Sequence, residues 1–197
     1  KDANLMVAKK SCETMQKSFV PDEHWELHFE LRRRPMGSIT PAPTLQQPMV
    51  AALGKVVFAS RDGVLYSMDP VKKIVLWPRI VGRFGDRVSN LTTQRDEIYI
   101  GNVIGEVTAI SAHTGKSRWV AKVGSPVLAA PGISRDSKWL AVGTTAGTVL
   151  IINNETGSIV SRFATENEVL ARPVFAGEML IAGSTDNHVY GYSMLKK

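Results

Sequence analysis

Apolar residues are distributed very differently in the two parts of this 197-residue chain. Val and Ile occur 3 times in residues 1–47 but 30 times in residues 48–197. Because β-branched side chains fit the pleated surface of a sheet, the second part is predicted to be all-β. The first part lacks this enrichment and is predicted to differ in structure.

The beginning of the chain shows a helical spacing of apolar positions. Five apolar residues there lie three or four positions apart: Leu5, Ala8, Cys12, Met15 and Phe19. This spacing predicts a short amphipathic helix within residues 1–19, which Pro21 would end. We therefore expect an N-terminal helical segment over residues 1–23.

Residues 24–47 are predicted to form a strand followed by a linker. From His24 to Leu31 polar and apolar residues alternate, which is the period of a half-buried strand. A proline-rich stretch follows, and turn-forming residues of this kind are typical of a connector.

The most informative feature is an internal repeat in residues 48–197. Four segments share the pattern of a strand, a tight turn and a second strand, and the turn positions are 42, 42 and 40 residues apart. The residues at these positions are Gly63, Gly105, Gly147 and Asn187. Gly and Asn tolerate positive φ best, so we expect all four to be structural turn residues of hairpins.

Further signals recur with the same period. A Thr-Gly turn follows the second and third hairpins, at Gly115 and Gly157, and Trp77 and Trp119 lie 42 residues apart. Three to four short strands in a unit of about 42 residues are typical of a β-propeller blade. We predict a β-propeller of which about four blades are present in this sequence, either as a complete ring or as part of a larger ring. In these blades Trp77 and Trp119, together with Trp25 from the predicted strand, are expected to pack the blades.

These motifs resemble a known family. The patterns Asp-Gly-x-Leu-Tyr-x-x-Asp, from Asp62 to Asp69, and Thr-Gly-Lys-x-x-Trp, from Thr114 to Trp119, resemble the quinoprotein-type (PQQ-like) β-propeller repeat. The segment Val174–Tyr190 looks most like the C-terminal propeller of acyl-CoA-synthetase-like, aminoadipate-semialdehyde-dehydrogenase-type enzymes. The BamB-type outer-membrane assembly proteins are the second likeness.

The resemblance implies no chemistry for this chain. Quinoprotein dehydrogenases hold their cofactor beneath two adjacent cysteines, with a calcium ion and a catalytic aspartate. Here the only cysteine is Cys12, outside the repeats. We therefore expect no catalytic residues, no bound cofactor and no metal site.

One other cluster suggests a metal. His24 and His28, with Glu26 and Glu30, would share one face of the predicted strand. No further clustered ligand is visible in the sequence, and a structural zinc site needs four ligands. We therefore interpret these residues as the solvent-facing side of an amphipathic strand.

Two features are candidate contacts with a partner. The run Arg32, Arg33 and Arg34 could contact phosphate or an acidic partner, or be a solvated linker. Trp139 could contact a partner or pack in the core. The net charge of +6 does not by itself indicate nucleic-acid binding, because no aromatic residues interleave with the arginines.

The leading functional hypothesis is a non-catalytic β-propeller scaffold that mediates protein–protein or interdomain interaction. The alternatives are an accessory propeller of an adenylate-forming, acyl-CoA-synthetase-like enzyme and a fragment of a quinoprotein dehydrogenase. No apolar run approaches the ~18 residues of a membrane span, which favours a soluble protein. We favour an intracellular location, with periplasmic and secretory locations left open.

The fourth repeat stops after its second strand, which would leave the last blade with an open edge. We expect the segment Trp25–Leu31 to pair with a strand of that blade. The result would be either a closed four-bladed ring or an arc that a partner extends.

Overall fold

The computed structural model describes residues 3–7, 15–19, 49–60, 63–81 and 88–194. The chain divides into two compact units, residues 1–40 and residues 41–197. Among the described residues, no helix is long and apolar enough to cross a membrane.

In the first unit the predicted helix is wrong. Residues Ala3–Val7 (β1) and Met15–Phe19 (β2) form an antiparallel hairpin, in which Ala3 pairs with Phe19 and Val7 with Met15. Leu5 and Val7 are two positions apart, and over so short a segment apolar residues fit the period of a strand as well as that of a helix. The predicted strand at residues 24–31 lies outside the described residues.

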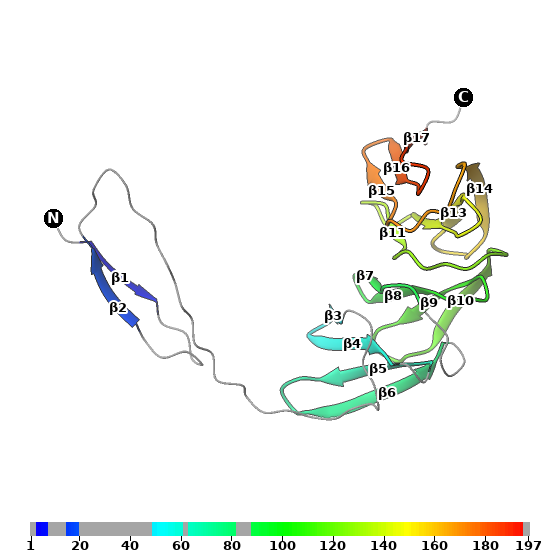
Figure 1. Ribbon diagram of the computed structural model, residues 1–197. Coiled ribbons are helices and arrows are strands. Elements are labelled where there is room, and N and C mark those ends of the chain that lie inside the picture. Colours follow the sequence, from blue (N-terminus) through cyan, green and yellow to red (C-terminus); the bar gives the residue numbers. More distant parts are fainter. Residues whose placement is uncertain (1–2, 8–14, 20–48, 61–62, 82–87, 195–197) are drawn as a thin grey trace. The chain divides into compact units, whose positions relative to one another are not determined.

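In the second unit the described strands form four antiparallel sheets, which we call blades 1 to 4 (Figure 1). Blade 1 contains β3 (Val50–Ala52), β4 (Lys55–Ala59), β5 (Val64–Asp69) and β6 (Ile74–Ile80). Blade 2 contains β7 (Thr92–Gln94), β8 (Glu97–Gly101), β9 (Glu106–Ser111) and β10 (Ser117–Lys122). Blade 3 contains β11 (Gly132–Ile133), β12 (Trp139–Gly143), β13 (Thr148–Asn153) and β14 (Ile159–Ala164). Blade 4 contains β15 (Val174–Ala176), β16 (Met179–Gly183) and β17 (Val189–Ser193).

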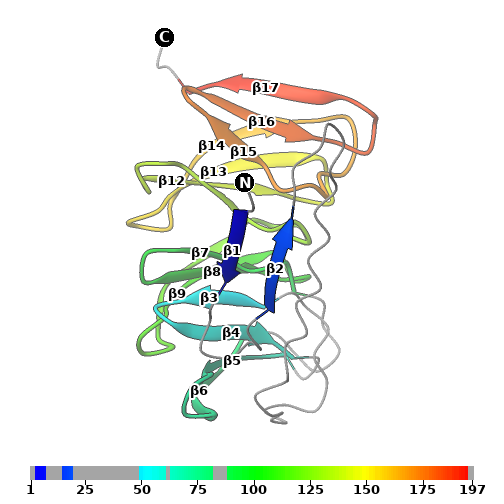
Figure 2. The same ribbon diagram turned by 90° about the vertical axis from the view of Figure 1, so that its left-hand side faces the viewer.

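The blades follow one another in chain order. Within each blade every strand pairs with the next, and the first strands of successive blades, β3, β7, β11 and β15, contact each other in turn. Figure 2 shows the four sheets one above another, from β3–β6 to β15–β17. This is the radial arrangement of propeller blades, with the first strands innermost.

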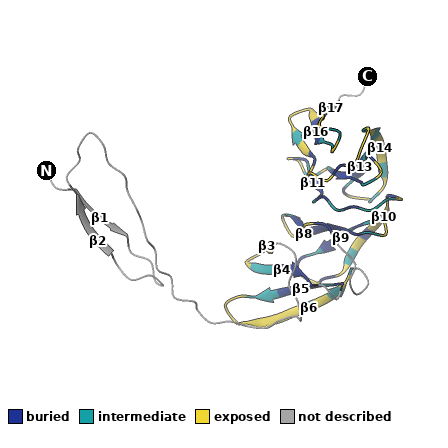
Figure 3. Ribbon diagram, in the orientation of Figure 1, coloured by how far each residue is buried: buried dark blue, intermediate teal, exposed yellow. Residues whose placement is uncertain are grey.

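The core lies between the blades. Successive side chains in a strand point to opposite faces of a sheet, so each blade has a forward face toward the following blade and a backward face toward the preceding one. The forward face of blade 2 carries Tyr99, Val107 and Ala109, which pack against Leu140 and Leu150 on the backward face of blade 3. Figure 3 shows the buried residues along the central strands.

The other two interfaces are built in the same way. Val57 and Leu65 of blade 1 pack against blade 2 residues Ile98, Ile100 and Ile110. Ala141, Val149 and Ile151 of blade 3 pack against blade 4 residues Leu180 and Ala182. Because both faces of blade 3 are buried, its middle strands β12 and β13 are apolar at every position except Thr148 and Asn153. Each fully buried Leu or Ile contributes about 1.5–3 kcal/mol.

The turn positions of the repeat lie between the second and third strands of each blade. Their φ angles are +78° at Gly63, +79° at Gly105, +67° at Gly147 and +68° at Asn187. At Gly105 the following interblade loop also approaches closely, since a Cβ there would lie 2.7 Å from the backbone N of Ser125. Blade 4 has Asn187 at this position, and Asn is, after Gly, the residue type that best tolerates a positive φ.

Candidate interaction site

Two tryptophans join consecutive blades. The indole N–H of Trp77 on β6 donates to the carbonyl oxygen of Ala112 (3.2 Å), and that of Trp119 on β10 donates to the carbonyl oxygen of Asn154 (2.8 Å). Each ring lies against the glycine of the next Thr-Gly turn. A Cβ on Gly115 would be 2.7 Å from the Trp77 ring, and one on Gly157 would be 2.8 Å from the Trp119 ring. The absence of side chains at these two glycines therefore makes room for the indoles.

The third interface lacks this contact. Ser161 stands 42 residues after Trp119, so no indole crosses from β14 to blade 4. There the rings of Phe163 and Tyr192 stack with centroids 4.3 Å apart, and the Tyr192 hydroxyl donates to the carbonyl oxygen of Ala164 (3.1 Å).

A polar cavity of about 430 Å³ opens between blades 2 and 3, beside Asn154. Three turns surround it: β7–β8, β11–β12 and β13–β14. Its lining includes charged, amide and aromatic residues: Arg95, Asp96, Glu97, Tyr99, Arg118, Asp136, Ser137, Lys138, Trp139, Asn153, Asn154 and Glu155. We call this feature the rim cavity.

The floor of the rim cavity is a connected hydrogen-bond network around Glu97. The Tyr99 hydroxyl donates to one carboxylate oxygen of Glu97, and the Arg118 guanidinium pairs with the other. Arg118 also donates to the carbonyl oxygen of Asn154 (2.7 Å). Burial, and then the hydrogen bond to Glu97, raise the pKa of Tyr99 above its ordinary value, so its hydroxyl remains a donor at neutral pH.

Asn154 ties the turns around the cavity together. Its backbone N–H donates to the carbonyl oxygen of Lys138 (2.9 Å), and its side-chain Nδ2 donates to that of Ser137 (2.8 Å). Its own carbonyl oxygen accepts from both Arg118 and Trp119. Asn154 thus joins the β13–β14 turn to the β11–β12 turn and to strand β10. Because these hydrogen bonds connect the two blades, the floor is rigid and is coupled to the packing of blades 2 and 3.

The mouth of the rim cavity is exposed and carries both signs of charge. Arg95, Asp96, Lys138 and Glu155 are exposed there. Asp136 accepts from the Ser134 hydroxyl (2.7 Å) and from the backbone N–H of Lys138, and these bonds lower its pKa. The mouth can therefore offer several charged hydrogen-bonding groups to a polar segment of another molecule, and among them the Asp136 carboxylate is held by two hydrogen bonds.

The chemistry available at the floor is limited. The carboxylate of Glu97 is shared between Tyr99 and Arg118, so the most buried acid of the cavity serves the network. Within the part of the chain that the structure describes, no group of three His, Cys, Asp or Glu residues could hold a metal ion.

The residues singled out from the sequence have different positions. Trp77 and Trp119 lie between blades as described, and Trp139 borders the rim cavity while packing against the cluster that joins blades 3 and 4. The turn residues Gly63, Gly105, Gly147 and Asn187 have the φ angles given above. The remaining candidates lie outside the described residues: Trp25, Arg32, Arg33, Arg34, His24, His28, Glu26 and Glu30.

Sequence reasoning missed the floor of the rim cavity. Tyr99, Glu97 and Arg118 carry no motif, because they meet only through strand pairing. Asn154 stands 35 residues after Trp119, as Ala112 stands 35 residues after Trp77, but the two residue types differ, so only the structure shows that both carbonyl oxygens accept from an indole.

Comparisons with known proteins agree with this architecture. The PQQ_2 family model, described as "Outer membrane protein assembly factor BamB", matches residues 39–130 and 105–196. Two curated relatives carry the same name. One, from Burkholderia pseudomallei, is 25% identical over 74% of this chain and 40% of its own length. The other, from Moranella endobia, is 24% identical over 74% of this chain and 36% of its own length. The chain thus spans about two fifths of these relatives.

Solved structures are similar at the level of the fold. BamB from Moraxella catarrhalis gives a TM-score of 0.64 at 22% identity, over 75% of this chain and 45% of its own. The computationally designed protein Ika4 gives 0.65 at 18% identity, over 76% of this chain and 92% of its own. The designed protein Ika8 gives 0.66 at 19% identity, over 74% of this chain and 44% of its own.

These matches confirm the β-propeller fold and the PQQ-like repeat. They give no support to the expected closer likeness to the acyl-CoA-synthetase-like propellers, and they favour the second likeness. On the extent of the family match, this chain belongs to the PQQ-repeat family described as outer membrane protein assembly factor BamB.

Proposed function

We propose that this chain is a non-catalytic scaffold that binds another protein, or another domain of a longer parent chain, at the rim cavity. The observation that carries the proposal is the combination of a rigid floor and an exposed, charged mouth. Loops held by a rigid scaffold are common sites of binding, because their side chains are positioned without being buried.

The charges at the mouth support a polar partner. The side chain of Lys138 is 73% exposed, and Arg95 is exposed on the facing turn. Asp96, in the same turn as Arg95, and Glu155, in the β13–β14 turn, add negative charge. A partner segment that carries both signs of charge would pair with these groups, and pairs of this kind set orientation more than affinity.

The names of the relatives also support a role in protein assembly. Both curated relatives are called outer membrane protein assembly factors. A scaffold that contacts other proteins is the part of such a role that a propeller can perform without catalytic groups.

Site-specific photocrosslinking tests the proposal. A benzoylphenylalanine residue is placed at position 138, at the mouth, or at position 122, which is exposed on the outer strand β10. We expect protein adducts from position 138 and none of the same mass from position 122. The adduct from position 138 should be lost in an Arg95→Glu background, because the charge of the mouth is changed there.

Two outcomes would contradict the proposal. One is the same set of adducts from both positions, which would indicate nonspecific contact. The other is an adduct from position 138 that is insensitive to Arg95→Glu but lost in a Lys122→Glu variant, which would place the contact on the outer strands.

A further inference from the structure

Two turns around the rim cavity have an unusual backbone conformation. Arg95, between β7 and β8, has a φ of +55°, and Ser137, between β11 and β12, has a φ of +63°. Both residues line the rim cavity. A left-handed conformation is unfavourable for any residue with a side chain, and the corresponding turn of blade 4 has Gly177, with a φ of +59°. Two side chains of the rim cavity are therefore held in a conformation that favours glycine.

Conformation alone does not distinguish Arg95. Leu53 occupies the same position in blade 1, two residues before the second strand, and its φ is +52°. The difference lies in the side chains, because those of Arg95 and Ser137 carry hydrogen-bond donors at a cavity and that of Leu53 does not. Strained residues with polar side chains are common at ligand-binding sites, and Leu53 supplies a matched control for the strain itself.

The repeat also shows that the polar groups of the rim cavity are not needed to join two blades. Blades 1 and 2 are joined by an indole hydrogen bond of the same kind as blades 2 and 3. At the equivalent positions, 42 residues earlier, apolar residues replace the polar ones of the rim cavity: Leu53 for Arg95, Val57 for Tyr99, Leu76 for Arg118 and Ala112 for Asn154. Since an interface of this type forms without these polar residues, their presence favours a role in binding.

A hydrogen bond fixes the two turns to each other. Gln94 Nε2 donates to Ser137 Oγ (2.7 Å). Because Oγ accepts in this bond, the Ser137 hydroxyl keeps its own proton for donation. Arg95 directly follows Gln94, and Lys138 directly follows Ser137. The guanidinium, hydroxyl and ammonium groups therefore come from two turns that are joined.

The hydrogen bonds within the rim cavity leave mostly donors for a ligand. Of the four carboxylates in its lining, those of Glu97 and Asp136 already accept hydrogen bonds from other residues of the chain. Arg118 makes two hydrogen bonds in the described structure, and a guanidinium has more N–H groups than that. Arg95 and Lys138 add exposed cationic groups. A ligand group with a negative charge and several acceptor lone pairs fits these donors, and a carboxylate is such a group.

The other two carboxylates of the lining, Asp96 and Glu155, lie at the exposed mouth. Solvent and salt weaken their repulsion of an incoming anion, whereas direct hydrogen bonds to a guanidinium are weakened less. These two acids would pair with a basic residue elsewhere in the same partner segment, which agrees with a partner that carries both signs of charge.

We propose that Arg95 determines which partner the rim cavity binds, by pairing with a carboxylate of that partner. The inference rests on the proposed scaffold function and names the chemical group that is recognised. The planar guanidinium would form two parallel hydrogen bonds with the carboxylate, while the Ser137 hydroxyl and the Lys138 ammonium donate from the facing turn. The left-handed conformation of Arg95 would then hold this side chain at the mouth, at a cost in the stability of the free chain.

The first test separates a binding role of Arg95 from a structural role. Arg95→Gly removes both the side chain and the strain, so its melting temperature should rise by about 2–4 °C while partner binding weakens at least about tenfold. Leu53→Gly should give a similar rise and leave partner binding unchanged. A structural role predicts the opposite sign, so a melting temperature that falls in Arg95→Gly but not in Leu53→Gly would overturn the inference.

The second test identifies the carboxylate. Mass spectrometry of the adduct from position 138 gives the partner segment, which is then synthesised as a peptide. In this peptide each Asp and Glu is replaced in turn by Asn or Gln, and a terminal carboxylate, where the segment has one, is replaced by an amide. We expect one replacement to weaken binding to the unaltered chain at least about tenfold and to have no further effect on binding to Arg95→Gly. A peptide with Lys in place of that acid should bind Arg95→Glu more tightly than it binds the unaltered chain.

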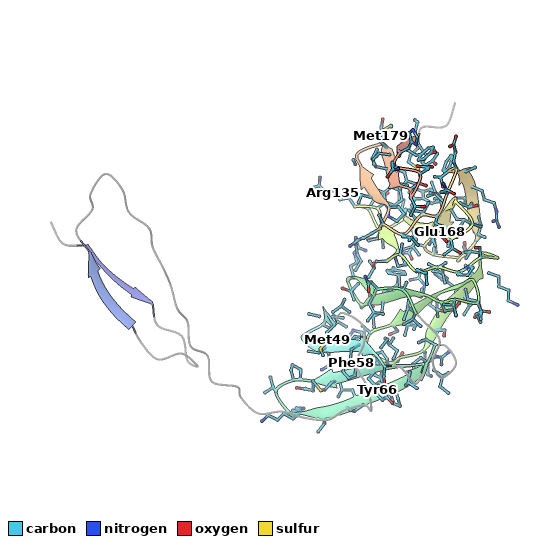
Figure 4. All side chains as sticks on the ribbon, in the orientation of Figure 1. Met49, Phe58, Tyr66, Arg135, Glu168 and Met179 are labelled. Carbon is cyan, nitrogen blue, oxygen red and sulfur yellow. The ribbon has the colours of Figure 1, made fainter. Side chains whose placement is uncertain are left out.

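Arg135→Glu is the matched control for the change of charge. Arg135 is exposed in the same β11–β12 turn as Ser137, but it is not one of the residues that line the rim cavity. Figure 4 shows its side chain directed away from the blades. The charge reversal at Arg135 should change the dissociation constant of the peptide by less than about twofold, because solvent and salt screen it.

The scaffold function and the role of Arg95 fail in different ways. The lack of any protein adduct from position 138 would overturn both. A peptide that binds Arg95→Gly as tightly as it binds the unaltered chain would leave the scaffold function standing and overturn the role of Arg95. A loss of binding only when a Lys or Arg of the peptide is replaced would overturn the carboxylate and indicate recognition by Asp96 and Glu155 instead.

Discussion

The close approach between the hairpin turns and the interblade loops allows a quantitative prediction at Gly105. Its φ of +79° strains any residue with a side chain by about 1–2 kcal/mol. In Gly105→Ala the new Cβ would also lie 2.7 Å from the backbone N and 3.1 Å from the backbone O of Ser125. Such overpacking against backbone costs about 1–3 kcal/mol, so the total is about 2–5 kcal/mol.

The matched control is Gly177→Ala. Gly177 has a φ of +59° but nothing within 4 Å of the Cβ position, so only the strain of about 1–2 kcal/mol should appear. The assay is the free energy of unfolding from urea titration monitored by tryptophan fluorescence. Gly147→Ala should behave like Gly105→Ala, because its Cβ would lie 2.9 Å from the carbonyl oxygen of Asn167.

The reasoning is refuted if Gly105→Ala and Gly177→Ala lose the same free energy of unfolding. That result would mean that the interblade loop does not pack on the turn and that the register of the repeat is not the one described.

Three further predictions concern the blade interfaces and the absence of cofactor chemistry. Trp119→Ala should lower the free energy of unfolding, measured by urea titration, by about 3–5 kcal/mol. The reason is that Trp119 is 8% exposed and its indole fills the space over Gly157. The control Ser161→Ala, at the equivalent position of blade 3, should change the free energy of unfolding by less than about 0.5 kcal/mol. Burial would raise the pKa of Asp186, but the hydrogen bonds it accepts from Tyr190 and the backbone of His188 lower it from 3.8 to about 2. The folded state therefore gains stability from the ionised carboxylate above about pH 4 and loses it as the pH falls toward 2, so Asp186→Asn should lower the melting temperature at pH 7 but hardly at pH 2; an equal loss at both values would contradict the network. Addition of PQQ and calcium should give no dye-linked alcohol oxidation, and calcium-dependent turnover would contradict the prediction drawn from the single cysteine.

Much of the second unit could be predicted from the sequence because its repeat carries local signals. A turn that needs positive φ favours residues such as Gly105 or Asn187, and the period of these residues places the two strands on either side of each turn. The spacing of Trp77 and Trp119, which equals the repeat length of 42 residues, reflects a contact that recurs between blades. At these positions the preference of the turn and the packing between blades require the same residues, so the blades could be predicted from one sequence.

The N-terminal hairpin and the floor of the rim cavity depend on contacts between segments that are separate in the sequence, and such contacts have no local sequence pattern. The helix predicted at residues 1–19 is wrong because apolar residues such as Leu5 and Val7 fit two periods over a short segment, and strand pairing decides between them. The meeting of Tyr99, Glu97 and Arg118 requires the register of three strands and the position of the next blade.

The affinity of the rim cavity for its partner tests the central claim most directly. With the protein identified by crosslinking from position 138, the dissociation constant is measured for the unaltered chain, Arg95→Glu, Lys138→Glu and the control Lys122→Glu. Scaffold binding at the rim cavity predicts that both mouth variants weaken binding at least about tenfold while the control binds as the unaltered chain does. Equal dissociation constants for all four proteins would contradict it.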